Sequence, residues 1–327
     1  MIRIGKISYW HVHADEYTGY ALENPNTELA AIWDENEERG KEKAAEYGVP
    51  YFSSLDELFA QDIDAVIVDA PTNIHHEVML KAARAGKHIF TEKVVAPTDS
   101  EVRDIVAAVR EAGVKLTVSL PRLNFGSTQA IAQIVQDGKL GTLTMARVRL
   151  SHNGATANWL PAHFYNKEQT AGGALIDLGC HPMYLVRHFL GMPESVSANY
   201  GYVTGREVED NAVSVLRYEN GALGIVEAGF VNAHSPYSVE LHGTEGSLLY
   251  GFPNEEGVYR SNLGSDQWEK IKIEDSQPMA FTQWVGHILN DTEATYNIEL
   301  ASDLTRLMEA SNRSVAEGRP IRIDELA

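Results

Sequence analysis

The stretch Gly86-Lys87-His88-Ile89-Phe90-Thr91-Glu92-Lys93 decides the fold of this chain. A turn glycine precedes an apolar, β-prone run that ends on a carboxylate and an amine, so charged groups stand where a strand stops. One helix earlier the chain has a second apolar run, Val66 to Ala70, followed by polar residues up to His75. Strand ends separated by one helix are expected to be neighbours at one edge of a parallel sheet, where ligands bind.

Strand-like and helical segments alternate through the first 120 residues. The expected strands cover residues 3–8, 28–33, 65–68, 88–91 and 115–119, and the expected helices cover 16–23, 35–47, 55–60, 75–85 and 100–112. Alternation at these intervals predicts right-handed βαβ units and a doubly wound parallel sheet, which places the chain in the α/β class. We assign residues 1–120 to a Rossmann dinucleotide-binding domain.

After residue 120 the pattern changes to longer alternating segments. A helix is expected at 127–136, and strands at 143–150, 195–204, 212–218, 222–231, 237–241 and 247–250. The short turns 219–221 and 243–246 indicate antiparallel pairing. We therefore assign residues 121–327 to an α+β domain with a large open, mainly antiparallel sheet, for substrate binding and oligomerisation. Its last helix, at 298–317, can pack back on the first domain.

Composition limits the partners of the protein. The chain has 327 residues, 44% of them hydrophobic, and a formal net charge of -19. This charge argues against a nucleic-acid or anionic-membrane partner and favours a small molecule. No apolar run approaches the roughly 20 residues of a membrane span. The single cysteine, Cys180, excludes an internal disulfide, and no charged and then apolar leader opens the chain, so we expect a cytoplasmic protein.

Four motifs follow one another along the chain, at 70–75, 85–93, 172–181 and 241–247. Their order and spacing resemble the Gfo/Idh/MocA family of NAD(P)-dependent sugar and polyol oxidoreductases, and the resemblance covers almost the whole length. It implies hydride transfer between a nicotinamide and a secondary hydroxyl or carbonyl of a sugar, inositol or related polyol. NAD is the cofactor that we expect.

Two positions depart from the family pattern. Val94 stands where the family usually has a proline after Glu-Lys. The segment Ser8-Tyr9-Trp10-His11-Val12-His13 stands where a glycine-rich fingerprint normally allows a tight turn close to the pyrophosphate, which Tyr9 and Trp10 cannot provide in the usual way. We expect this loop still to face the ligand crevice, with Ser8, Tyr9, Trp10 and His11 as cofactor contacts and the helix start binding the phosphates.

Further cofactor contacts follow from the other strand ends. Asp34 ends the second strand, where an acid binds the adenosine ribose, and together with Glu35 it opposes a ribose phosphate. A helix N-cap is the alternative for Asp34. The resemblance implies that the nicotinamide side is lined by Pro71, Thr72, Asn73, His75 and Glu92. Asn73 has an alternative as a helix cap.

The resemblance also implies the catalytic residues. His181 would be the acid or base on the reacting hydroxyl, Asp177 its orienter or a substrate ligand, and Lys93 the electrostatic stabiliser and proton relay. Asp177 and His181 are four residues apart, so on one helix they would share a face and could hydrogen-bond. A structural pair is the alternative. The preceding Gly172-Gly173 would let a ligand approach the backbone closely.

Residues between the two halves of the fold could form a sugar-sized pocket with an aromatic wall. Arg122 and Trp159 are the first candidates, followed by His152, His163 and Tyr165. Scattered aromatic residues are also common in cores and interfaces, which is the alternative for this group.

Two other functional classes stay open. His11-Val12-His13 resembles the metal-binding signature of amidohydrolase barrels, and His75 or His76 could add ligands. The chain has five or six strand-helix units rather than the eight of a barrel, which argues against this hydrolase. A metal would need a third and a fourth ligand, for which only His75 or His76 is an obvious candidate, so no metal is expected. The second alternative is a family member that has lost catalysis and acts as a binding or accessory protein, because its first loop lacks the glycines.

The second domain has few expected helices for its large sheet. One sheet face should therefore remain without a helical cover, and apolar residues such as Val213, Val215 and Ile225 need another partner. We expect a homodimer or homotetramer.

Overall fold

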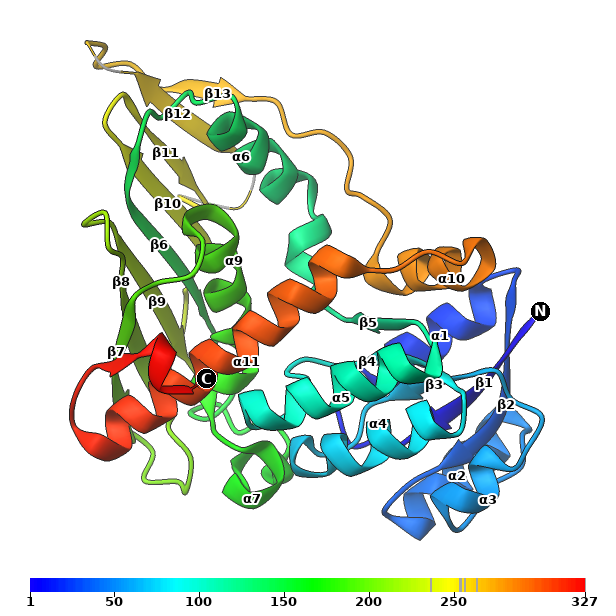
Figure 1. The fold of residues 1–327 in the computed structure, drawn as a ribbon. Coiled ribbons are helices and arrows are strands. Elements are labelled where there is room, and N and C mark those ends of the chain that lie inside the picture. The colour runs from blue at the N-terminus through cyan, green and yellow to red at the C-terminus, as the bar shows by residue number, and fades with distance from the viewer. Residues whose placement is uncertain (236, 253–254, 256, 263, 327) are drawn as a thin grey trace. The chain divides into compact units, whose positions relative to one another are not determined.

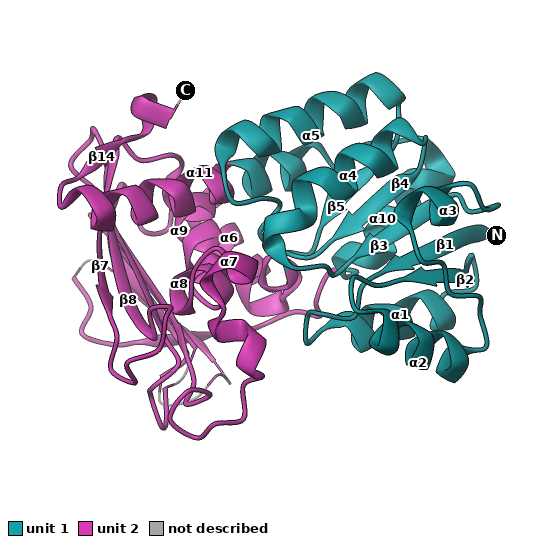
Figure 2. Ribbon diagram, turned by 90° about the horizontal axis from the view of Figure 1, so that it is seen from below, with its two compact units in different colours: residues 1–120, 278–302 teal, residues 121–277, 303–327 magenta. Residues whose placement is uncertain are grey.

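The structure is a computed structural model that describes residues 1–327 except residues 236, 253, 254, 256, 263 and 327. The chain divides into two compact units, coloured separately in Figure 2. The first comprises residues 1–120 and 278–302, and the second comprises residues 121–277 and 303–327. The sequence analysis divided the chain at the same place but assigned all of 121–327 to the second domain. No helix among the described residues is both long and apolar enough to cross a membrane.

A five-stranded parallel sheet forms the centre of the first unit (Figure 1). Its strand order is β2-β1-β3-β4-β5, and the strands are β1 (Ile2–Ile7), β2 (Thr27–Trp33), β3 (Ala65–Val68), β4 (His88–Thr91) and β5 (Leu116–Val118). The doubly wound order confirms the predicted fold class, and it excludes the eight-stranded barrel that the hydrolase alternative requires.

Helices cover both faces of this sheet. They are α1 (Ala14–Glu23), α2 (Glu37–Tyr47), α3 (Leu55–Phe59), α4 (His75–Arg84), α5 (Asp99–Ala112) and α10 (Ala280–Asn290). On one face α1 and α10 bury a cluster that includes Tyr17, Phe90 and Trp284. On the other face α4 lies against α5 and contacts β3 and β4. The sequence analysis did not predict α10. This helix belongs to the first unit although it lies far along the chain from β5.

A nine-stranded mixed sheet forms the second unit. Its order is β13-β12-β11-β10-β6-β9-β8-β7-β14, and only the β6–β9 pair among the described strands is parallel. The strands are β6 (Leu143–Ser151), β7 (Ser195–Gly201), β8 (Asn211–Arg217), β9 (Leu223–Gly229), β10 (Ser238–Gly243), β11 (Gly246–Tyr250), β12 (Val258–Asn262), β13 (Glu269–Ile271) and β14 (Ile321–Arg322). The predicted turns do join antiparallel neighbours, β8 to β9 and β10 to β11.

Helices lie along one face of this sheet (Figure 1). They are α6 (Gly126–Gln136), α7 (Lys167–Thr170), α8 (Ala174–Asp177), α9 (Cys180–Leu190) and the part of α11 (Thr295–Glu317) from residue 303 onward. Burial alternates along β8, where Ala212, Ser214 and Leu216 are buried and Val213 and Val215 are half-buried. The half-buried residues therefore belong to the face that these helices do not cover.

Candidate active site

The turn after β1 is tight although it has no glycine. Ser8 adopts a left-handed backbone conformation with φ 69°, which is the conformation that a glycine adopts most easily. Its N–H donates to the carbonyl oxygen of Trp33 at 2.7 Å, and its Oγ accepts from the N–H of Trp10 at 3.0 Å. The hydroxyl and the neighbouring strand thus support the turn that the fingerprint glycine usually forms.

Tyr9 packs inward rather than toward a ligand crevice. Its ring stacks on Tyr47 with centroids 6.1 Å apart, and its hydroxyl lies 3.1 Å from Thr18 Oγ1. Tyr9 and Trp10 are both buried. The Tyr9 ring belongs to a buried cluster that includes Ala14 of α1 and Ala44 of α2. The sequence analysis expected that Tyr9 and Trp10 could not provide the tight turn in the usual way, and in the structure Ser8 forms it.

Asp34, expected at the adenosine ribose, is buried and fully hydrogen-bonded. Its Oδ1 accepts from the N–H of Asn36 and from Arg39, and its Oδ2 accepts from the N–H of Tyr9 and from Arg39. The helix cap of α2 is Asn36, so the alternative role of Asp34 as the cap is wrong. Arg39 also pairs with Glu35 at 2.5 Å, so the two acids after β2 share one positive charge.

A buried ion pair lies beneath the first loop. Lys6 of β1 pairs with Asp69, the residue after β3, and both side chains are fully buried. Burial lowers the pKa of Lys6 well below its usual value, although the carboxylates of Asp15 and Glu92 oppose this effect. Removing one partner of such a pair leaves a buried charge and costs about 3–5 kcal/mol. The sequence analysis did not predict this pair, because a single lysine in an apolar strand does not indicate which acid it contacts.

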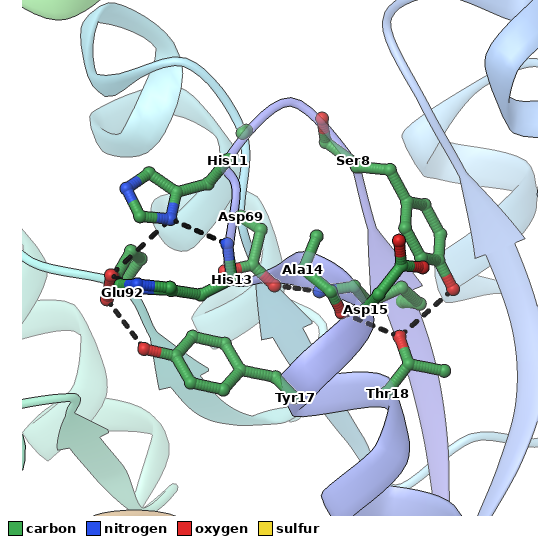
Figure 3. Close-up of polar contacts among 12 residues, drawn as sticks. Ser8, His11, His13, Ala14, Asp15, Tyr17, Thr18, Asp69 and Glu92 are labelled. Atoms are coloured by element: carbon green, nitrogen blue, oxygen red, sulfur yellow. Dashed lines mark hydrogen bonds and ion pairs between the residues drawn. The ribbon is translucent and has the colours of Figure 1, made fainter. Parts of the chain in front are cut away.

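Three aromatic side chains of the first loop and α1 converge on Glu92 (Figure 3). His13 Nδ1 lies 2.8 Å and His11 Nδ1 lies 3.5 Å from Glu92 Oε1. The hydroxyl of Tyr17 donates to Glu92 Oε2 at 2.9 Å, and the N–H of Lys93 donates to the same oxygen at 3.0 Å. Glu92 was predicted at this edge, but His13 and Tyr17 were not among the predicted contacts of the cofactor.

The histidines determine the charge of this cluster. Burial alone would raise the pKa of Glu92, but the charges of His11 and His13 hold it well below its usual value. Burial would also lower the pKa of His13, yet its hydrogen bond to Glu92 raises it. Glu92 is therefore a buried carboxylate with imidazole partners.

His75 belongs to the backbone support of the site rather than to its surface. It is buried, with Nδ1 3.1 Å from the carbonyl oxygen of Val94 and Nε2 2.9 Å from that of Ala70. Burial lowers its pKa. Both ring nitrogens already contact the chain, which argues against the predicted cofactor role and leaves neither for a metal.

The other residues of this turn differ in exposure. Pro71 and Thr72 are buried, and Asn73 is exposed. The cap position of α4 is Ile74 without a side-chain bond, so the proposed cap role of Asn73 is wrong. Lys93, directly after Glu92, is buried, and its peptide bond to Val94 is cis.

In the second unit, the glycine pair allows close packing of two backbone segments. A Cβ on Gly173 would lie 2.0 Å from the carbonyl oxygen of Glu209. The buried Glu209 carboxylate accepts from the N–H of Gly173 at 2.9 Å and from that of Leu175 at 3.0 Å. The space that we expected for a ligand at Gly173 is therefore taken by the chain itself. Glu209 was missed because nothing in its polar local sequence indicates burial.

Asp177 and His181 lie on two consecutive helices. Asp177 ends α8, and His181 follows the start of α9 at Cys180, so the single helix face that we expected is wrong. His181 Nδ1 lies 3.2 Å from the hydroxyl of Tyr184, which accepts from the N–H of Arg122 at 3.0 Å. The Tyr184 hydroxyl thus links Nδ1 of His181 to the backbone at Arg122, and its own hydrogen can donate to Nδ1.

The two pocket candidates belong to different aromatic clusters. The guanidinium of Arg122 lies 4.0 Å from the centre of the Tyr237 ring. Trp159 is 55% exposed, and its ring lies 4.5 Å from that of His152. Burial lowers the pKa of His152, while the nearby charge of Asp177 opposes this effect. Asp177 therefore lies on the Trp159 side of the second unit.

Two family descriptions match the chain. Residues 4–120 match "Oxidoreductase family, NAD-binding Rossmann fold", and residues 128–249 match "GFO/IDH/MocA C-terminal domain". Together they cover most of both compact units. The first match lies on the segment that contains the Ser8 turn, Glu92 and Lys93, and the second contains Asp177 and His181.

Similar proteins support the same assignment. The chain is 31% identical over 245 residues to 1,5-anhydro-D-fructose reductase of Ensifer adhaerens, covering 72% of each protein. It is 25% identical to scyllo-inositol 2-dehydrogenase (NAD(+)) of Bacillus subtilis, covering 99% of this chain and 95% of the relative. The structure of the WlbA dehydrogenase of Bordetella pertussis with NADH and UDP-GlcNAcA has a TM-score of 0.85 at 23% identity, covering 98% and 97% of the two chains. At this identity the structural likeness concerns the fold alone.

Proposed function

Because the chain belongs to the GFO/IDH/MocA oxidoreductase family, we propose that it transfers a hydride between NAD and a secondary hydroxyl or carbonyl of a sugar, inositol or related polyol. One observation carries the proposal. Glu92 and Lys93 follow β4 at the carboxyl edge of a parallel sheet, inside the segment that matches the NAD-binding description. The substrate class rests on the names of the relatives, which include an anhydrosugar reductase and an inositol dehydrogenase.

Two features of the first unit fit a bound dinucleotide. The left-handed Ser8 forms the turn, and α1 begins at Ala14, so its first N–H groups lack acceptors within the helix and can bind a pyrophosphate. We assign the cofactor contacts to Ser8, the start of α1, Thr72 and Glu92, because the N–H groups of residues 9–11 already donate to Asp34, Ser8 and Asp69. Asp34 fits less well, since a ribose hydroxyl would have to displace one of its four donors.

We assign proton transfer, charge stabilisation and substrate binding in the reaction to three side chains. When bound, the nicotinamide supplies or accepts the hydride. His181 exchanges the proton of the reacting oxygen, and the Tyr184 hydroxyl holds its ring at Nδ1. Lys93 stabilises negative charge on that oxygen, and Asp177 binds the substrate. Arg122 and Trp159 are proposed to contact the sugar.

We expect NAD to be preferred to NADP. Asp34 and Glu35 repel a ribose phosphate, and Arg39, which could bind one, is already paired with both acids. Arg39 therefore makes the preference for NAD weaker than the two acids alone would make it. The double variant Asp34→Ser with Glu35→Arg should narrow the discrimination. Unchanged discrimination would remove Asp34 from the cofactor site.

Titration with NADH tests the cofactor half of the proposal. Protein fluorescence or calorimetry on dialysed protein should show saturable binding, followed by turnover on at least one member of a sugar and polyol panel. Absence of binding at millimolar NADH would favour the accessory-protein alternative. Binding without turnover on the panel would leave the cofactor assignment intact and reject the substrate class.

The assembly proposal is a cytoplasmic homodimer or homotetramer. It is supported by the half-buried Val213, Val215 and Ile225, which alternate along β8 and β9 with the buried residues. Light scattering at micromolar concentration should give a mass of two or four chains. A monomer, or a variant Val215→Lys with an unchanged mass, would contradict this surface as the interface.

A further inference from the structure

We propose that His11, His13 and Glu92 form a binding site for one divalent transition-metal ion. The proposal goes beyond hydride transfer and does not depend on it, because the three residues belong to one compact unit and need no dinucleotide. The sequence analysis expected no metal because it had only His75 and His76 as further ligands. The structure brings Glu92, 79 residues after His13, to the two loop histidines.

The ligand atoms are close to the spacing of a metal centre. One nitrogen of each histidine and one oxygen of Glu92 all lie within 4.8 Å of one another. Bonds of about 2.0–2.1 Å in a tetrahedral site place neighbouring ligand atoms about 3.3 Å apart. Glu92 Oε1 lies 2.8 Å from His13 Nδ1 and 3.5 Å from His11 Nδ1, on either side of that value. The His13 ring now contacts Glu92, and Nδ1 of His11 accepts from the N–H of His13 at 3.3 Å, so a bound metal ion would replace these two contacts.

The two oxygens of Glu92 have separate tasks. Oε1 faces both imidazoles, whereas Oε2 accepts from the hydroxyl of Tyr17 and from the N–H of Lys93 (Figure 3). The Tyr17 hydroxyl also lies 2.7 Å from Ser119 Oγ, which fixes it. Outer hydrogen bonds of this kind orient the ligands of metal centres, and here they direct one carboxylate oxygen at the imidazole pair.

Charge gives a second argument for a cation. Two other buried carboxylates near this sheet edge contact a basic side chain, Asp69 with Lys6 and Asp34 with Arg39. Glu92, only 2% exposed, contacts imidazoles instead, and the ammonium of Lys93 acts on it through space. A buried carboxylate needs a compensating charge. A metal ion on the same three ligands supplies that charge without requiring a proton between His13 and Glu92.

The donor set identifies the class of metal. Two imidazole nitrogens and one carboxylate suit Zn²⁺, Co²⁺, Ni²⁺, Fe²⁺ or Mn²⁺, whereas Ca²⁺ and Mg²⁺ prefer oxygen ligands throughout. Three protein ligands also leave at least one position for water or a ligand oxygen, which is the arrangement of catalytic rather than structural sites.

Metal uptake by the full chain without nucleotide tests the proposal. Chelator-treated and dialysed protein is titrated with Co²⁺, followed by visible absorption, and with Zn²⁺, followed by elemental analysis after gel filtration. The wild type should bind one equivalent and show the bands of a Co²⁺ ion with nitrogen ligands. His13→Ala should bind Zn²⁺ at least tenfold more weakly, and Tyr17→Phe, which removes no ligand, about 10–100-fold more weakly.

His76→Ala is the matched control. His76 is also a histidine of the first unit, but it pairs with Asp104 and lies outside the cluster, so this variant should bind like the wild type. Circular dichroism confirms that each variant is folded, and His13→Gln replaces His13→Ala if the latter is not. No uptake by folded wild type, or equal uptake by all variants, would overturn the site. NADH titration of the metal-free protein separates the two proposals, since either can fail alone.

Discussion

The first loop of the parallel sheet and the Gly172–His181 segment of the second unit relate to their sequence motifs in opposite ways. The loop lacks the fingerprint glycines, yet Ser8 adopts the left-handed conformation that the turn needs. The segment has both glycines of its motif, yet Gly173 makes room for the backbone of Glu209. The loop therefore keeps the geometry of the turn although its sequence departs from the motif. The segment matches its motif, but this match does not show that it contacts a ligand.

The difference arises from what supports each backbone. A left-handed residue other than glycine costs roughly 1–2 kcal/mol, and the hydrogen bonds of Ser8 to Trp10 and Trp33 offset part of that cost. At Gly173 the alternative is a collision with a carbonyl oxygen, which no hydrogen bond can offset. A residue with a side chain can therefore replace a glycine that is needed only for a left-handed backbone conformation. It cannot replace a glycine whose missing Cβ lets another backbone segment approach.

The largest expected effect is on turnover and involves both regions. Lys93→Ala and His181→Ala should each lower kcat by about 10²–10⁴-fold, as expected for groups that stabilise charge or transfer a proton. Cofactor affinity should change much less. Steady-state kinetics on the best sugar and NADH fluorescence measure the two quantities. Asp177→Asn should fall between these variants and the wild type, and nearly full kcat in His181→Ala would refute the proton role.

The second prediction tests the glycine pair directly. Gly173→Ala should destabilise the protein by about 3 kcal/mol or more, because its Cβ would lie 2.0 Å from a backbone oxygen. Gly172→Ala is the control, since its Cβ would meet the Ile176 side chain at 3.2 Å rather than a backbone oxygen and should cost about 1 kcal/mol. Urea unfolding measures both. Equal losses would mean that Gly173 is not the closely packed position.

The sequence predicted the elements better than it predicted the contacts between them. The parallel sheet followed from local periodicity, and so did the placement of Glu92 and Lys93 at a strand end. The partners of Glu92 did not, because Tyr17 precedes it by 75 residues and looks like an ordinary residue of an amphipathic helix. Polar contacts between residues far apart in the sequence leave no periodic pattern. The break between the helices that carry Asp177 and His181 depends on packing, which the sequence pattern does not show.

The third prediction concerns acid stability of the helix that carries His181. His188, later on α9, has a pKa lowered to about 4 by burial and by the nearby Arg187. Its unfolded pKa is about 6.5, so between pH 6.5 and 4 the unfolded chain binds more protons, and stability falls as the pH falls. From pH 7 to 5 this group should remove about 2 kcal/mol. Urea unfolding at both pH values should show a smaller loss in His188→Gln; an identical loss would contradict the assignment.

The smallest expected effect is on stability, and it tests whether Ser8 takes the place of a fingerprint glycine. Ser8→Ala removes the acceptor of the Trp10 N–H while the left-handed strain remains, so it should destabilise the protein by about 1 kcal/mol. Ser8→Gly removes the same hydroxyl but also the strain, so its loss should be smaller than that of Ser8→Ala. Thermal unfolding compares the two variants. If glycine were as destabilising as alanine, the turn would depend on the hydroxyl alone. Ser8 and Gly173 would then differ in whether a side chain is needed for its contacts, and not in the backbone conformation that each position requires.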